Sequence, residues 1–149
     1  MEIDVKSRQI LRELAREGRI SNLELAQRVA LSPSACLRRV QELERSGVIK
    51  GYRAVIDREK TGEGFSAYVA VGLSDHTKKS QEGFERAMDA APQVRECHNV
   101  AGAFEYLLRV EVADLAAYKV FHTDILGTVR HVNSITSYVV MESSKDERK

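Results

Sequence analysis

The sequence predicts an α+β fold in two parts, a helical N-terminal part and a C-terminal part in which strands and helices alternate. Capping signals at Ser21 and Ser32 mark two short helices separated by only about three residues. The composition changes at the glycine-containing stretch 61–64. Beyond it, apolar runs and amphipathic segments follow the order βαββαβ, which is typical of a ferredoxin-like (split βαβ) domain.

Residues 4–14 predict the first helix. Ile10, Leu11 and Leu14 supply its apolar side, and the stretch 16–18 with its glycine ends it. This helix gives the following pair of helices a third element to pack against.

The next two helices form a tight pair. Ser21 and Glu24 fit a capping box, and Ser32 followed by Pro33 fits an N-cap with proline in the first helical position. The short connection between them is that of a helix-turn-helix, the motif that places its second helix in the major groove of double-stranded DNA.

The second helix of the pair has two distinct faces. At 100° per residue, Cys36, Val40 and Leu43 share the side expected to be buried. Arg38 lies opposite them, one turn into the helix, where it can reach a guanine or a phosphate. The alternative is a solvated charged face without a role in binding. The candidate DNA-binding residues are Ser32, Ser34, Ala35, Arg38, Arg39, Gln41 and Arg45.

Strand-like content at 48–56 predicts a wing or linker strand, which makes the first part a winged helix-turn-helix. We expect a DNA-binding domain at 1–50, a linker strand at 51–62, a ferredoxin-like domain at 63–142 and a disordered charged tail at 143–149.

The C-terminal part predicts an antiparallel sheet with both helices on one face. Strands are expected at 65–73, 94–100, 105–112 and 132–141, and helices at 78–91 and 115–126. The other face needs a partner, and we expect a second copy to cover it. The apolar residues expected on that face are Val69, Val71, Leu107, Val139 and Met141.

Charge and composition favour a soluble DNA-binding protein. Residues 1–60 carry 13 Lys and Arg against 9 Asp and Glu, whereas residues 61–149 carry 10 against 13. Only the first part therefore suits a polyanion. No apolar run approaches the ~20 residues of a membrane-spanning helix and no signal peptide is recognisable, so we expect a cytoplasmic, nucleoid-associated protein.

The sequence lacks the residue patterns of an enzyme or a metal site. Its four histidines are scattered without metal-ligand spacing, and it has no phosphate loop or dinucleotide-binding fingerprint. We expect no catalytic residues, no metal and no cofactor. Cys36 and Cys97 do not make a disulfide framework and are expected to be reduced and partly buried, with redox sensing as the alternative.

Taken together, these features resemble the Lrp/AsnC family, the leucine-responsive and asparagine-synthetase-type regulators also called feast/famine proteins. The residues that carry the resemblance span almost the whole chain. They are Ile10, Leu11 and Leu14, Gly18 to Ser21, Leu25 and Ala26, Leu31 to Pro33, Arg38 to Val40, Leu43 and Glu44, Gly47 to Ile49, Gly51 and Tyr52, Val100 to Val110, and Tyr138 to Glu142.

The resemblance implies a transcriptional regulator that binds DNA through its N-terminal domain and an amino acid through its C-terminal domain. It also implies a homodimer formed through the sheet, commonly assembled to an octamer. The effector is expected between dimers, near the turn that joins the second and third strands and near the last strand. The implied effector-binding residues are Ala101, Gly102, Ala103, Phe104, Glu105, Thr136 and Ser137.

The chain departs from the family pattern at this implied site. The family usually has Gly-Asp-x-Asp-Tyr where residues 102–106 read Gly-Ala-Phe-Glu-Tyr, and often Thr-x-Thr where 135–137 read Ile-Thr-Ser. Loop N–H groups remain for an effector carboxylate, Glu105 or loop carbonyls for its ammonium group, and Ser137 for either. Alternatively, Gly102 only permits a tight turn and Glu105 is solvated. The alanine at 103 favours a second function, an architectural DNA-binding protein that senses nothing.

Overall fold

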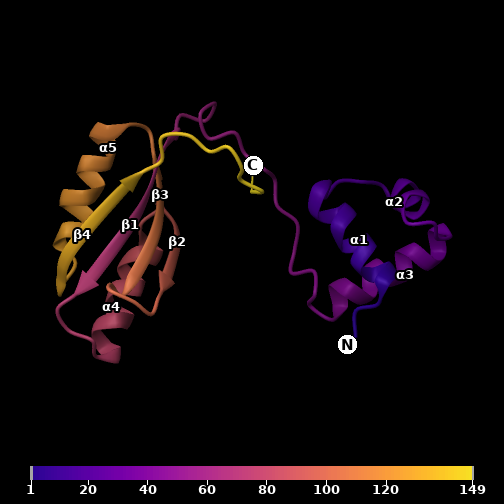
Figure 1. Cartoon of the computed structure of the whole chain (residues 1–149), viewed down its shortest axis with the longest axis horizontal. Coiled ribbons are helices and arrows are strands. Elements are labelled where there is room, and N and C mark those ends of the chain that lie inside the picture. The colour runs from indigo at the N-terminus through magenta and orange to yellow at the C-terminus, as the bar shows by residue number, and fades with distance from the viewer. Residues whose placement is uncertain (1, 149) are drawn as a thin grey trace. The chain divides into compact units, whose positions relative to one another are not determined.

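The computed structural model describes residues 2–148, which form two compact units divided between Ala54 and Val55 (Figure 1). The division falls inside the segment 51–62 that was expected to link two domains. Residues 1 and 149, the outer ends of the expected DNA-binding domain and tail, lie outside the described range.

Apart from the strand expected at 48–56, the order of elements follows the predicted one. The N-terminal unit holds α1 (Val5–Arg16), α2 (Asn22–Arg28) and α3 (Pro33–Arg45). The C-terminal unit holds β1 (Phe65–Leu73), α4 (Lys78–Ala90), β2 (Val94–Asn99), β3 (Tyr106–Val112), α5 (Leu115–Val120), a π-helical turn (Phe121–Ile125), a 3₁₀ turn (Leu126–Thr128) and β4 (Val132–Val139).

Each N-terminal helix begins at a side-chain cap. Asp4 accepts a hydrogen bond from the N–H of Ser7 at 2.8 Å, Ser21 from that of Glu24, and Ser32 from that of Ala35. These bonds satisfy N–H groups that the helix leaves unpaired. The predicted starts of α2 and α3 are therefore confirmed.

The turn between α2 and α3 is held by local bonds. Ala30 adopts a left-handed conformation with φ of 54°, and the N–H of Leu31 donates to the carbonyl of Ala26 at 2.9 Å. The side chain of Asn22 donates to the carbonyl of Pro33 at 2.8 Å. These contacts set the angle at which α3 leaves the turn.

The three helices enclose a small apolar core. Each of its members is 3% exposed or less, and burying a large aliphatic side chain contributes roughly 1.5–3 kcal/mol. The core residues are Ile10, Leu25, Ala26, Val29, Cys36 and Leu43. The face of α3 predicted to be buried is thus the one that packs.

The C-terminal unit is a four-stranded antiparallel sheet in the order β2-β3-β1-β4, the ferredoxin-like topology predicted from sequence. Both helices pack on one face, where Val71 and Leu108 of the sheet meet Phe84 of α4 and Tyr118 of α5. We call the opposite side of the sheet the open face.

The residues expected on the open face are mostly elsewhere. Val69 and Val71 are fully buried under the helices, and Val139 pairs with Ala67 and so lies on that same side. Met141 follows the end of β4 and is 97% exposed. The expectation was wrong for these residues because apolar and polar residues do not alternate in the run 67–73. The sequence pattern therefore does not indicate which of its side chains point to which face of the sheet. The residues on the open face include Tyr68, Leu107, Arg109, Thr136 and Tyr138.

The helix predicted at 115–126 changes geometry midway. It is α-helical only to Val120, and the N–H of Leu126 then reaches back five residues to the carbonyl of Phe121. A Cβ at Gly127 would lie 3.0 Å from the carbonyl oxygen of His122, so this tight ending suits glycine. The single-helix prediction missed this π-helical turn.

The segment 48–56 is not a strand, contrary to prediction. Its residues make no sheet pairing within the described chain, and Tyr52 and Val55 are more than half exposed. A strand requires a neighbouring strand for its backbone groups, and no other segment within residues 2–148 supplies one here.

The tail after β4 has no regular structure in its described part, yet Arg148 is held. Its guanidinium donates to Glu96 at 2.8 Å and to the hydroxyl of Tyr68 at 3.2 Å. The tail therefore contacts the open face. Within residues 2–148, no helix is long and apolar enough to cross a membrane.

Candidate DNA interface and effector site

The N-terminal end of α3 presents a small polar surface. Ser32 caps the helix, and Ser34 lies exposed with its hydroxyl oxygen 3.4 Å from that of Ser32. Ala35 is half-buried. Small side chains here let the helix end approach another molecule closely, and its free N–H groups suit a phosphate.

Arg38 is the uncommitted cation of this helix. Its side chain is exposed and makes no hydrogen bond or ion pair with the described residues. Gln41 is likewise exposed and unbonded. Both lie opposite the buried Cys36, as the helical spacing predicted.

Arg39, another predicted DNA-binding residue, is paired within the N-terminal unit. Its guanidinium donates to both oxygens of Asp4, at 2.9 and 2.7 Å, and to the hydroxyl of Ser7 at 3.3 Å. This pairing with Arg39, followed by the N–H of Ser7, lowers the pKa of Asp4 to about 2. Arg39 thus joins α3 to the cap of α1.

Arg45 is intermediate between these cases. It forms two-pronged hydrogen bonds with Glu42, the shortest at 2.7 Å, while its side chain stays 76% exposed. The hydrogen bonds that Arg45 donates to Glu42 raise the pKa of Arg45. DNA would have to compete with Glu42 for this guanidinium.

Sequence reasoning missed the residue that joins α1 and α2. Arg28 reaches Glu13 at 3.2 Å and Glu17 at 3.0 Å, and also pairs with Glu24. The i,i+4 spacing of Glu24 and Arg28 signals only one of these pairs, because the other two carboxylates belong to α1 and to the residue that caps its C-terminal end. Glu24 therefore pairs with Arg28 as well as lending its N–H to the cap.

The loop 101–105 forms the turn between β2 and β3. The N–H of Val100 donates to the carbonyl of Glu105 at 2.9 Å, and the side chain of Asn99 donates to the same oxygen at 3.1 Å. Gly102 has a φ of 156° and an added Cβ there would meet nothing within 4 Å. Ala101 and Ala103 are exposed, and Phe104 is half-buried.

Glu105 is neither solvated nor free. One carboxylate oxygen accepts from the N–H of Leu73 at 2.7 Å, and the other lies 3.2 Å from Nδ1 of His76. Its side chain is only 20% exposed. The carboxylate therefore fastens the end of β1 to the start of β3, which leaves loop carbonyls as the freer acceptors for an ammonium group.

Thr136 and Ser137 are not brought together. Thr136 pairs with Ala70 on the open face, whereas Ser137 pairs with Val69 on the helix side. The Ser137 hydroxyl hydrogen-bonds to that of Tyr118, a side chain only 5% exposed. Within one chain, only the loop residues and Glu105 form a common cluster.

Both cysteines are free thiols. Cys36 is buried in the helical core and Cys97 is half-buried in β2. Burial, with a smaller contribution from Glu85, raises the pKa of Cys97 to about 11. A thiol so rarely ionised at neutral pH is a poor nucleophile, which argues against redox sensing.

Two family models cover nearly the whole chain. Residues 3–50 match the winged helix-turn-helix DNA-binding model, and residues 66–149 match the Lrp/AsnC ligand binding domain. The leucine-responsive regulatory protein of Escherichia coli K12 is 38% identical over 148 residues, which is 99% of this chain and 90% of that protein.

Solved structures agree with the fold. A transcriptional regulator from Neisseria meningitidis, in complex with L-methionine, matches with a TM-score of 0.93 and 33% identity, over 97% of this chain and 94% of the other. A feast or famine regulatory protein from M. tuberculosis, also complexed with L-methionine, matches with a TM-score of 0.84 and 33% identity, over 99% and 98%. These relatives are regulators rather than enzymes. The chain belongs to the Lrp/AsnC family of DNA-binding transcriptional regulators with an amino-acid ligand-binding domain.

Proposed function

We propose that this protein regulates transcription by binding specific DNA sequences through the exposed face of α3. We further propose that an apolar amino acid such as methionine or leucine controls this binding. The observation that carries the proposal is the difference among the arginines of α3. Arg39 and Arg45 are paired with carboxylates, whereas Arg38 is exposed and unpaired one turn into the helix. Ser34 and Gln41 flank it on the same surface.

The loop 101–105 is the part of the proposed effector site that a single chain assembles. Its N–H groups can donate to an amino-acid carboxylate, and its carbonyls can accept from the ammonium group. Thr136 and Ser137 would contribute only through contacts between subunits or a rearrangement of β4. The two relatives with bound L-methionine support an apolar amino acid as effector.

A homodimer, assembled further to an octamer, completes the proposal. In the described part of the chain no helix covers the open face, where Tyr68, Leu107 and Tyr138 lie, and Tyr138 is 57% exposed. A second copy seated there would place two α3 helices on one DNA, as a two-fold related site requires. The protein would act in the cytoplasm, at the nucleoid.

An architectural DNA-binding protein without an effector is the second candidate. The engagement of Glu105 with Leu73 and His76 favours it, since the one carboxylate at the loop is already occupied. Alanine at 103 supplies no replacement.

A thermal-shift screen of the full chain against the twenty amino acids separates the two candidates. A ligand at 100 times its Kd adds about 2.7 kcal/mol to the free energy of unfolding, an easily measured shift. Ala103→Trp, which fills the exposed side of the loop, should abolish the shift while leaving the unliganded stability unchanged. No shift with any amino acid would support the architectural function instead.

A further inference from the structure

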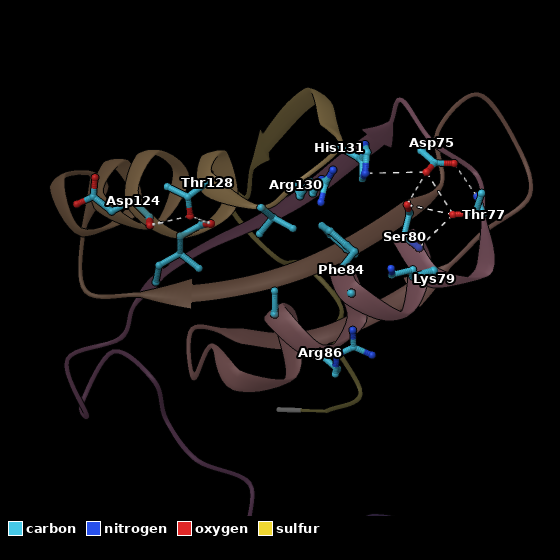
Figure 2. A pocket seen from close by; sticks show the side chains of 14 residues that line it. Asp75, Thr77, Lys79, Ser80, Phe84, Arg86, Asp124, Thr128, Arg130 and His131 are labelled. Carbon is cyan, nitrogen blue, oxygen red and sulfur yellow. Dashed lines mark hydrogen bonds and ion pairs between the residues drawn. The ribbon is translucent and has the colours of Figure 1, made fainter.

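A cavity lies on the helix side of the C-terminal unit. A cavity of about 790 Å³, which we call the α4 cavity, opens between α4 and the segment 124–131 (Figure 2). Phe84, Ala87, Ile125 and Val129 supply its apolar wall. None of the proposed effector residues lines it, so it is separate from the loop 101–105.

Cations without partners surround the α4 cavity. Lys79 and Arg86 of α4 and Arg130 from the opposite side line it, and none of the three makes an ion pair or side-chain hydrogen bond with the described residues. Lys79 and Arg86 are seven residues apart and so lie on the same side of α4. Asp124 is the one lining carboxylate that is equally uncommitted.

The other lining carboxylate, Asp75, is already satisfied. It accepts from the N–H of Thr77 at 3.0 Å and from the hydroxyl of Ser80 at 2.8 Å. Nε2 of His131 lies 3.9 Å away on its remaining side (Figure 2). Thr77 and Ser80 are neutral partners, so the negative charge of Asp75 remains. Three cations and two carboxylates therefore line the α4 cavity, an excess of one positive charge.

Three locally unfavourable features of the backbone meet at the same cavity. Gly83 sits in the middle of α4, where glycine is a poor helix former, although a Cβ there would meet nothing closer than Arg86 at 3.8 Å. His131 has a φ of 71°, rare for a residue with a side chain. The π-helical turn that ends at Ile125 is of a kind frequent at functional sites.

Gly83 is the most informative of the three. Neither a positive φ nor a close backbone contact requires glycine at this position. What the missing side chain does provide is space in the α4 cavity, which Gly83 lines. The chain thus keeps the cavity open at a cost to helix stability.

We propose that the α4 cavity binds an organic carboxylate with a compact apolar body, of the kind represented by a branched-chain 2-oxo acid. Lys79 and Arg130 would hold the carboxylate, and the apolar body would lie against Phe84 and Ile125. A 2-oxo acid fits better than the corresponding amino acid because its net negative charge matches the excess positive charge of the cavity. The amino acid is a zwitterion and carries no net charge.

Isothermal titration of the full chain with ketoleucine, the 2-oxo acid that carries the side chain of leucine, tests this proposal. We expect ketoleucine to bind at one saturable site. Its affinity there should be about tenfold or more higher than that of L-leucine or of inorganic phosphate. Gly83→Leu projects a branched side chain into the cavity and replaces glycine by a better helix former, so it should abolish binding. Arg130→Ala should weaken it about tenfold or more, the loss expected for one charge-assisted hydrogen bond.

Two variants serve as controls. Lys78→Ala removes an exposed neighbouring lysine that does not line the cavity, and it should bind ketoleucine like the wild type. Ala103→Trp should also bind ketoleucine normally, even where it has lost the response to amino acids. This result distinguishes a site in the α4 cavity from the proposed effector site at the loop 101–105. Equal affinity in Gly83→Leu and the wild type, no saturable binding, or equal binding of phosphate or leucine would overturn the proposal.

Discussion

Replacing Arg38 by alanine should weaken specific DNA binding without affecting the fold. The side chain is exposed and unpaired, so its removal costs no internal bond and leaves the core of α1 to α3 untouched. A guanine contact is worth about 1–3 kcal/mol, or roughly 5- to 150-fold in Kd. A dimer with two such contacts would lose about twice that free energy.

Arg45→Ala is the matched control on the same helix. Arg45 lies seven residues further on, on the same side of α3, but its guanidinium is paired with Glu42 at 2.7 Å. Breaking the pair with Glu42 costs free energy that offsets the gain from a DNA contact. We therefore expect Arg45→Ala to lose less DNA affinity than Arg38→Ala.

Fluorescence anisotropy with a labelled operator at several salt concentrations measures both variants. A base contact at Arg38 relaxes specificity at one position and leaves the salt slope nearly unchanged, whereas a phosphate contact lowers that slope by about 0.9. Wild-type affinity in Arg38→Ala, together with weakened binding in Arg45→Ala, would refute the assignment of Arg38 to the groove.

Three further outcomes are expected from the side-chain pairs. Ser137→Ala should destabilise the C-terminal unit by ~1–3 kcal/mol in urea unfolding, because the buried hydroxyl of Tyr118 loses its partner, and Tyr118→Phe combined with it should cost less than the sum of the two. The pKa of Asp4 is lowered to about 2 in the folded chain, so ionised Asp4 stabilises the N-terminal unit at pH values above the unfolded pKa of about 4. The free energy of unfolding should therefore fall as the pH drops from about 4 through about 2, and Asp4→Asn should remove that fall. Cys97, with its pKa raised to about 11, should react with iodoacetamide at pH 8 far more slowly in the folded chain than in denaturant, and equal rates would contradict its burial.

The elements that the sequence predicted well are those defined by local signals. Ser21 and Ser32 act within three residues of themselves, so the starts of α2 and α3 follow from the sequence directly. The order of strands and helices follows from the same kind of short-range pattern. Helical spacing likewise placed Arg38 opposite Cys36.

The features that the sequence did not reveal depend on distant partners. Arg39 is paired with Asp4, 35 residues earlier in the chain. Ser137 faces Tyr118 because of the register of β4 against β1, which no local pattern reveals. The segment 48–56 has strand-forming residues but lacks a neighbouring strand among the described residues.

The α4 cavity was not anticipated from the sequence at all. Its cations lie on α4 and on the segment after α5, and only the packing of both helices on one sheet face brings them together. A glycine inside a predicted helix, Gly83, is the one signal that sequence reasoning could have used.

The most direct test of the proposed function is the affinity of the full chain for DNA flanking its own gene, measured with and without L-methionine and L-leucine. Coupling free energies between two sites are typically about 1–3 kcal/mol, so we expect one of these amino acids to change the Kd by roughly 5- to 150-fold. Ala103→Trp should bind the same DNA with the affinity of the unliganded wild type and show no response. DNA binding that no amino acid alters would contradict an effector-controlled regulator, and absence of specific DNA binding would contradict the assignment of α3.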